Sequence, residues 1–169
     1  DTEAYQQLNS VIAIGSGQLW GKGLNNTDIA SVKNGNFLPE SQTDFIFAVI
    51  GEELGFVGSA AVILLLILIA MRCVSIARVA KDTAGMVIAA GMGALIGIQG
   101  FMNIAVATMM MPNTGLPLPF VSYGLTSLVS LYIGMGLVLN VGLQSSAYNK
   151  EIQKKGQKSD TYFRKEEYL

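Results

Sequence analysis

Three long runs of apolar residues divide this sequence into alternating apolar and polar segments. The runs cover residues 54–71, 84–107 and 125–143, and an apolar stretch at 45–50 extends the first toward the N-terminus. Each run is close to the roughly 20 residues that a helix needs to cross a bilayer. The pattern predicts an all-α membrane protein with three spanning helices and an apolar, proline-rich loop at about 108–122.

Composition supports a membrane location and excludes several kinds of site. Half of the residues are hydrophobic, and no Asp, Glu, Lys or Arg stands between Asp82 and Lys150. A soluble fold would expose that stretch as uncharged surface, whereas a bilayer accommodates it. With no histidine and with Cys73 as the one cysteine, zinc sites, Ser-His triads and internal disulfides are excluded within this sequence. A lipid bilayer is expected as a partner, and nucleic acid is not.

Basic residues indicate which ends of the spans face the cytoplasm. They follow the first run at 72–81 and recur in the tail 147–169. Because Lys and Arg are enriched on the cytoplasmic side, both segments are expected inside. Residues 1–50 then form a large outer loop with short interfacial helices, 51–146 hold the three spans, and the loop at about 108–122 lies outside.

Glycines recur along the second span, which predicts that this helix packs against protein rather than lipid. Small side chains let helix backbones approach closely, and Gly93 with Gly97 also forms a G-x-x-x-G match. We interpret the pattern as general helix packing rather than as a dimerisation motif. The glycines concerned are Gly85, Gly91, Gly93, Gly97 and Gly100.

The stretch "GSGQLWGKGL" at 15–24 invites comparison with phosphate-binding loops. A phosphate loop would need glycine at position 16 and Ser or Thr at 23, where this sequence has Ser16 and Gly23. A dinucleotide fingerprint would need glycine at position 20, which is Trp20. The nucleotide interpretation therefore fails, and the glycines are expected to let the backbone bend tightly or approach a ligand.

Apolar residues before and within this stretch predict a short amphipathic helix at the membrane interface, where tryptophan is favoured. They are Leu8, Val11, Ile12, Ile14, Leu19 and Trp20.

Asp44 stands where a polar loop meets the first apolar run, between Thr43 and Phe45. As a structural residue, Thr43 or Asp44 would cap the helix that follows. As a functional residue, a partly desolvated carboxylate at the membrane mouth is a competent base. The residues alone leave both interpretations open. Glu52 and Glu53 pose the same alternative nearer the membrane.

The second outer loop is apolar and carries three prolines, which prevent a regular helix. Non-helical backbone at membrane depth is tolerated only when it is buried in protein or lines a cavity. We therefore expect residues 109–124 to fold back into the protein.

Three motifs together resemble the SEDS family of RodA, FtsW and SpoVE proteins, over roughly residues 5–146. They read "YQQLNSVIAIGSGQLWGKGL", "FLPESQTDFIFAVIGEELGFVG" and "PNTGLPLPFVSYGLTSL". The resemblance implies the last three spans and the large extracytoplasmic loop of a fold of about ten helices. Many relatives have histidine where this sequence has Gln42, and a second glycine where it has Leu125.

The resemblance also implies a function in the bacterial cytoplasmic membrane, with the catalytic loop outside and the C-terminus in the cytoplasm. The family polymerises lipid II into peptidoglycan during elongation, division or sporulation, beside a class B penicillin-binding protein. Asp44 matches the family's essential aspartate, which implies an inverting glycosyltransferase with a carboxylate base. Residues expected at the substrate are Lys22, Glu40, Thr43, Thr114, Pro117, Pro119, Ser122 and Tyr123.

Several alternatives stay open at this stage. Lys22 either steers the substrate pyrophosphate or is a solvated lysine at the interface. A divalent cation on that pyrophosphate is compatible with the chemistry, although no ligand cluster in the sequence requires one. The protein is alternatively a lipid II flippase, or a scaffold without catalysis that recruits the penicillin-binding protein.

Overall fold

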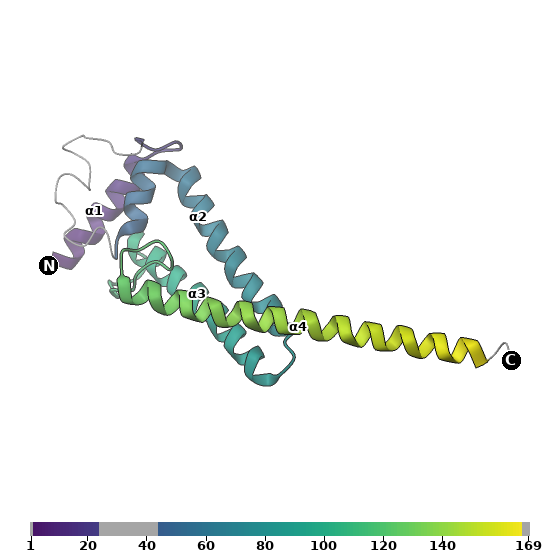
Figure 1. The fold of residues 1–169 in the computed structure, drawn as a ribbon. Coiled ribbons are helices and arrows are strands. Elements are labelled where there is room, and N and C mark those ends of the chain that lie inside the picture. The colour runs from purple at the N-terminus through teal and green to yellow at the C-terminus, as the bar shows by residue number, and fades with distance from the viewer. Residues whose placement is uncertain (1, 24–43, 167–169) are drawn as a thin grey trace.

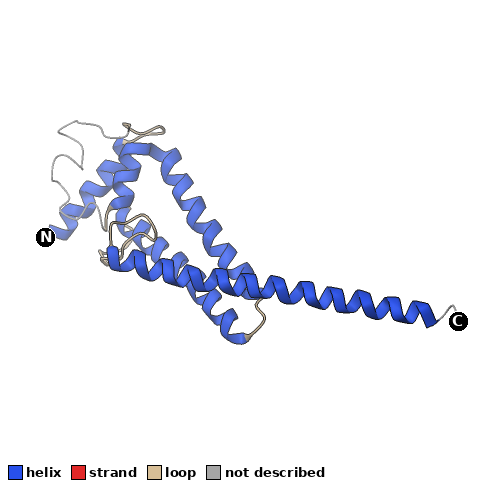
Figure 2. Cartoon of the chain, viewed as in Figure 1, coloured by secondary structure: helices blue, strands red, loops and turns tan. Residues whose placement is uncertain are grey.

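In the computed structural model, residues 2–23 and 44–166 are described, and they form four helices joined by loops (Figures 1 and 2). No strand occurs within those two ranges, so the prediction of an all-α protein is confirmed. The helices are α1 (Thr2–Ser16), α2 (Ile46–Arg78), α3 (Thr83–Ala107) and α4 (Leu125–Glu166).

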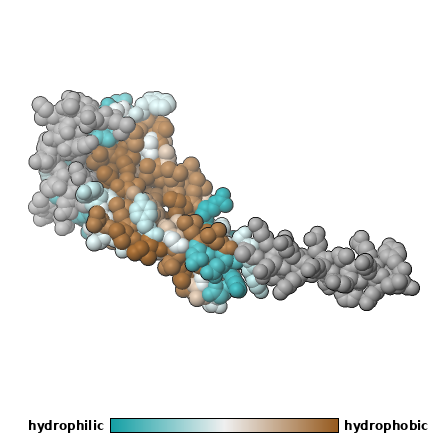
Figure 3. All heavy atoms as spheres, viewed as in Figure 1, coloured by the Kyte–Doolittle hydropathy of each residue, from teal (hydrophilic) through white to brown (hydrophobic). Residues whose placement is uncertain are grey.

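Three of the helices are long and apolar enough to cross a membrane, as the sequence predicts. The segments are Ile46–Arg78, Thr83–Ala107 and Leu125–Ser146. Only 17%, 28% and 11% of their most apolar windows are buried within the chain. The remaining apolar side chains face outward, which is stable only in apolar surroundings. Figure 3 shows this hydrophobic surface on the body of the bundle, with hydrophilic residues gathered where α4 leaves it.

The helix boundaries agree with the predicted ones at the first span and extend beyond them at the third. The first span begins at Ile46, so the apolar residues 46–50 belong to α2, as the extension of the first run predicts. The helix of the third span continues through Glu166, and α4 projects well past the other helices (Figure 1). The predicted basic tail is therefore helical over most of its length.

Packing of α2 against α3 forms most of the bundle, and α4 covers part of α3. Small residues make this packing close, because a Cβ on Gly93 would lie 3.0 Å from the Cys73 Cβ and 3.1 Å from the Ala70 carbonyl oxygen. Gly85 and Gly100 likewise face neighbouring side chains, whereas a Cβ on Gly91 or Gly97 would meet no described atom of another segment within 4 Å. The packing interpretation is thus confirmed for Gly85, Gly93 and Gly100, whereas Gly91 and Gly97 show no such contact with the described residues.

One end of the bundle is tied together by the turn after α2. The hydroxyl of Ser145 in α4 donates a hydrogen bond to the Val79 carbonyl. The Lys81 ammonium lies 5.4 Å from the centre of the Tyr148 ring, within the range of a cation–π contact. Both basic segments identified in the sequence therefore start from the same end.

The opposite end gathers α1, the start of α2 and the loop after α3. The last carbonyls of a helix lack partners within it, and α1 supplies donors for the end of α3 and for the loop that follows it. Ser10 Oγ donates to the Ala107 carbonyl at 2.8 Å, and Gln7 Nε2 donates to the Met111 carbonyl at 2.8 Å. All of the predicted outer segments that the structure describes thus meet at one end of the molecule.

The predicted amphipathic helix forms, but with different limits. It ends at Ser16, so Leu19 and Trp20 lie in the turn that follows rather than in the helix. Its buried face carries Ser10 and Ala13, while most of the apolar residues that predicted it are exposed: Leu8, Val11, Ile12, Leu19 and Trp20.

Candidate functional site

A break in α2 organises the outer end of the molecule. Gly55 has φ 66° and ψ −162°, a combination that essentially only glycine adopts. In an unbroken helix, the amides of Phe56 and Val57 would donate to the carbonyls four residues earlier, at Glu52 and Glu53. The break removes this arrangement and leaves two donors and two acceptors that need other partners.

The segment after α1 supplies all four partners. Phe56 N donates to the Gln18 carbonyl at 2.9 Å and Val57 N to the Leu19 carbonyl at 3.3 Å. In return, the amides of Lys22 and Gly23 donate to the carbonyls that the break frees, at 2.9 and 3.1 Å. Residues 17–23 therefore supply the hydrogen bonds that α2 cannot make within itself at the break.

This exchange accounts for two of the four glycines in the 15–24 stretch. A Cβ on Gly17 would lie 1.9 Å from the Gly51 carbonyl oxygen, and one on Gly21 would lie 2.2 Å from the Glu53 oxygen. Gly21 also has φ 78°, where a Cβ is disfavoured. The close approach that these two glycines allow is to the backbone of α2, and approach to a ligand stays a prediction.

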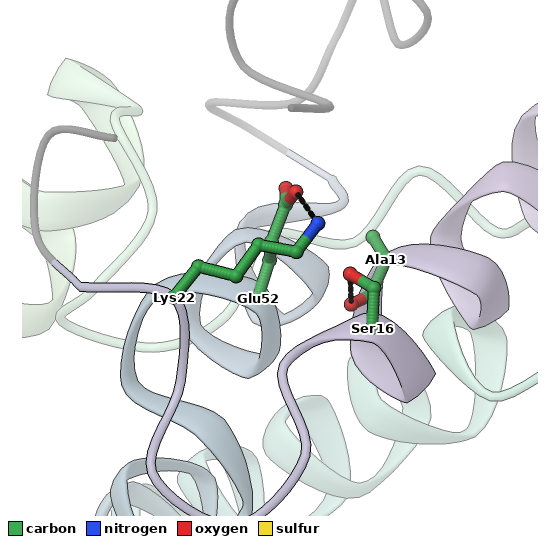
Figure 4. A network of polar contacts seen from close by, with 4 residues as sticks. All are labelled: Ala13, Ser16, Lys22 and Glu52. Atoms are coloured by element: carbon green, nitrogen blue, oxygen red, sulfur yellow. Dashed lines mark hydrogen bonds and ion pairs between the residues drawn. The ribbon is translucent and has the colours of Figure 1, made fainter. Parts of the chain in front are cut away.

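Lys22 is paired rather than free in solvent. Its Nζ lies 3.0 Å from Glu52 Oε1, and the side chain of Glu52 is only 3% exposed. Figure 4 shows the lysine reaching from the segment after α1 to the glutamate on α2. Lys22 thus contacts Glu52 through both its backbone amide and its ammonium. A buried carboxylate requires such a partner, because desolvating an unpaired charge costs several kcal/mol.

Asp44 lies at the entrance to α2 and is partly buried. The residue that caps α2 is Phe45, and no side chain makes a capping hydrogen bond there. Of the two interpretations of Asp44, the capping role therefore receives no support. Phe45 is 1% exposed and packs with Ala13 and Val106, so the residue next to Asp44 is anchored between α1 and α3.

The backbone of Asp44 is joined to the proline-rich loop through α3. Asn103 Nδ2 donates to the Asp44 carbonyl at 2.8 Å and to the Leu116 carbonyl at 2.7 Å. A Cβ on Gly115 would lie 3.7 Å from Asp44 Oδ2, so the carboxylate faces this part of the loop. Asp44 has no side-chain hydrogen bond or ion pair to any of the described residues.

The proline-rich loop is folded onto the bundle, as predicted from its apolar sequence. Leu118 is 1% exposed and its amide donates to Ser122 Oγ at 2.7 Å. Gln99 Nε2 on α3 donates to the Pro117 carbonyl at 3.0 Å. Non-helical backbone groups at this depth are therefore satisfied by polar side chains of the protein, as they must be in apolar surroundings.

The predicted substrate residues occupy different environments. Thr114 and Tyr123 are exposed, and Pro117 is half-buried. Pro119 and Ser122 are buried and shape the loop from inside. Lys22 is held by Glu52. The remaining two, Glu40 and Thr43, lie outside the described residues.

Sequence reasoning did not identify Asn103 and Gln99, although a signal was present. Both are polar residues in an apolar span, four positions apart and hence on one helix face. Polar side chains in membrane helices commonly make hydrogen bonds between helices. Within residues 2–23 and 44–166, no three His, Cys, Asp or Glu side chains gather as a metal site. A cation on the substrate pyrophosphate stays a prediction.

Comparison with known proteins identifies relatives over most of the chain. The family model described as cell cycle protein, for FtsW, RodA and SpoVE, matches residues 1–147. Stage V sporulation protein E of Bacillus subtilis is 42% identical over 83% of this chain and 37% of its own length. Two proteins named probable peptidoglycan glycosyltransferase FtsW, from Nitrosomonas europaea and Enterococcus hirae, are each 40% identical over 82% and 89% of this chain.

A solved structure supports the same relationship. It carries the description "Structural coordination of polymerization and crosslinking by a peptidoglycan synthase complex", and the match has a TM-score of 0.62 at 28% identity. It covers 82% of this chain and 37% of the other. The chain spans little more than a third of the curated relatives, 37% and 36% for the first two. By sequence and by fold, the chain belongs to the SEDS family of FtsW, RodA and SpoVE proteins.

Proposed function

We propose that this chain carries the catalytic base of a peptidoglycan glycosyltransferase that polymerises lipid II. The observation that carries the proposal is the position of Asp44. Its carboxylate faces the proline-rich loop, is partly buried, and makes no side-chain bond to a described residue. The names of the relatives, which include probable peptidoglycan glycosyltransferases, support the same reaction.

The chemistry requires one base and a good leaving group. In the proposed reaction, Asp44 takes the proton of the 4-hydroxyl of an acceptor N-acetylglucosamine. The hydroxyl oxygen of the acceptor then attacks C1 of the donor sugar. The bond from C1 to the lipid pyrophosphate breaks, and the pyrophosphate leaves with the bonding electrons. Attack opposite the leaving group converts an α-linked donor into a β-1,4 link, so the configuration inverts. A divalent cation bound to the pyrophosphate would travel with the substrate.

The proposed orientation places this site outside the cytoplasm. Asp44, α1 and the loop after α3 lie at one end, whereas the turn at 79–82 and the far end of α4 lie at the other. Basic residues in and beside that second end support a cytoplasmic location for it. A class B penicillin-binding protein is the proposed partner, because the similar solved structure is described as a complex of polymerisation and crosslinking.

Purified full-length protein, reconstituted with the partner and fluorescent lipid II, tests the proposal. The wild type should yield glycan polymer, and Asp44→Asn should yield none while expressing normally and binding the partner. Asparagine keeps the size of the side chain but accepts no proton at this step. Loss of a general base costs about two to four orders of magnitude in rate.

Two other outcomes would replace the proposal. Transbilayer movement of lipid II without polymer in the wild type would assign transport. Partner binding with neither polymer nor movement would assign a scaffold. Near-normal polymerisation by Asp44→Asn would leave the glycosyltransferase assignment standing but remove Asp44 as its base.

A further inference from the structure

Asn103 lies in the last turns of α3 and is 1% exposed. Its Nδ2 carries two hydrogens, and two carbonyl oxygens lie within hydrogen-bond distance, those of Asp44 and Leu116. These carbonyls belong to segments 59 and 13 residues away in the sequence. One buried side chain therefore joins the entrance of α2 to the proline-rich loop.

We propose that Asn103 is a positioning residue for glycosyl transfer, which holds Asp44 against the proline-rich loop. This inference rests on the proposed function, in which Asp44 is the base. The hydrogen bond from Asn103 to the Asp44 carbonyl fixes the position of the Asp44 main chain. The next residue, Phe45, is buried. Together they restrict the carboxylate to the space beside Gly115, whose Cβ position lies 3.7 Å from Oδ2.

The environment of Asn103 argues that its amide nitrogen is the group required. Oδ1 of Asn103 is buried and has no hydrogen-bond partner among the described residues. Burying an amide oxygen without a partner is unfavourable unless the amide nitrogen makes compensating hydrogen bonds. The two bonds from Nδ2 offset that cost, and they supply donors to two carbonyls of non-helical backbone. A second link, from Gln99 to Pro117, holds the loop but does not contact Asp44.

The difference between these two links defines the test. In the full-length protein with its partner, Asn103→Leu removes both bonds and keeps a similar volume, whereas Gln99→Leu releases only the loop. Asn140→Leu is the matched control, because Asn140 is an exposed residue of α4 whose side chain contacts Gln144. Polymerisation of fluorescent lipid II then gives kcat and KM for each variant.

Asn103→Leu should lower kcat about 100-fold with KM within about twofold of the wild type, because misplacing a base by about 1 Å costs that much. Gln99→Leu should lower kcat less than about tenfold, and Asn140→Leu should resemble the wild type. Should the leucine variant fail to fold, Asn103→Asp carries the test, since it keeps the shape of asparagine while losing both N–H donors. Wild-type kcat in either folded variant would overturn the inference.

A measurement without catalysis separates positioning from general stability. Cysteines placed at Asp44 and Thr114 should be joined by a short bis-maleimide crosslinker, and Asn103→Leu should lower the yield severalfold. Unchanged crosslinking would overturn the inference. Asp44→Asn distinguishes the two proposals: if it abolishes polymer while Asn103→Leu does not slow the reaction, only the inference on Asn103 fails. If Asp44→Asn polymerises normally, Asp44 is not the base, and the inference on Asn103 fails with it.

Discussion

Lys22 contacts Glu52 twice, with its backbone amide 2.9 Å from the Glu52 carbonyl and its ammonium 3.0 Å from the carboxylate. The first bond belongs to the repair of the α2 break, and the second neutralises a side chain that is 3% exposed. Both originate from residues 30 positions apart in the sequence. The lysine therefore fastens the segment after α1 to the broken helix.

Replacing Lys22 by methionine should destabilise this junction. Methionine keeps the length and apolar stem of the side chain but leaves the Glu52 carboxylate without its ammonium partner. Because only the glutamate of this pair is buried, removing its ammonium partner should cost about 1–3 kcal/mol, so the thermal midpoint of the purified protein should fall.

The double variant Lys22→Met with Glu52→Gln provides the control. Because it removes both charges, it should recover part of the stability that Lys22→Met loses, and a double-mutant cycle would measure the coupling. Additive losses would show that the two side chains do not interact. A large rise in KM for lipid II in the stable double variant would instead support a role for Lys22 at the pyrophosphate.

Gly55→Ala should be among the most damaging small substitutions in the chain. The residue would have to keep φ 66°, and its Cβ would lie 2.3 Å from the Gly21 amide nitrogen. Backbone strain of this kind costs about 1–3 kcal/mol, before the steric overlap is counted. Thermal unfolding and protease sensitivity of the outer segments should report the loss.

Gly97→Ala is the matched control for that substitution. Gly97 is helical, and no described atom lies within 4 Å of its Cβ position. Alanine should therefore be tolerated there, or stabilise the helix by up to about 1 kcal/mol. Equal losses in the two variants would contradict the importance of the break at Gly55.

The contrast between these two glycines shows what the sequence can predict. Run lengths and charges are local properties, so the three spans follow from them directly. The break at Gly55 cannot be predicted in this way, because α2 also contains Gly51 and Gly58 and nothing local distinguishes them. The position of the break is determined by the segment at 17–23, which supplies the replacement hydrogen bonds only after the chain has folded.

The candidate site likewise contains residues that local sequence identifies and contacts that depend on the tertiary fold. Asp44 is identifiable from its position at a polar-to-apolar junction and from the family motif around it. Its capping role is plausible from sequence, and only the backbone geometry at Phe45 removes the support for it. Asn103 is visible as a polar residue in an apolar span, but its two partners come from segments that tertiary folding brings together.

The proposed orientation predicts opposite labelling of two exposed threonines. Thr114 lies in the loop after α3, and Thr83 begins the same helix at the other end. In cells producing the full-length protein, a cysteine at 114 should react with a membrane-impermeant maleimide, whereas one at 83 should react only after the membrane is permeabilised. The reverse pattern would invert the topology and place Asp44 in the cytoplasm.

The final prediction concerns Gly115, which stands opposite the proposed base. It has φ 64°, and a Cβ there would meet Asp44 Oδ2 at 3.7 Å, which is ordinary contact rather than a clash. Gly115→Ala should therefore fold with a strain of about 1 kcal/mol, yet place a methyl group where an acceptor hydroxyl must approach the carboxylate. We expect polymerisation to fall at least about tenfold.

Gly124→Ala is the control, because its Cβ would meet only Ser127 Cβ at 3.6 Å and its φ is not in the left-handed region. Equal activity of the two variants would show that the space beside Gly115 is not used by the acceptor.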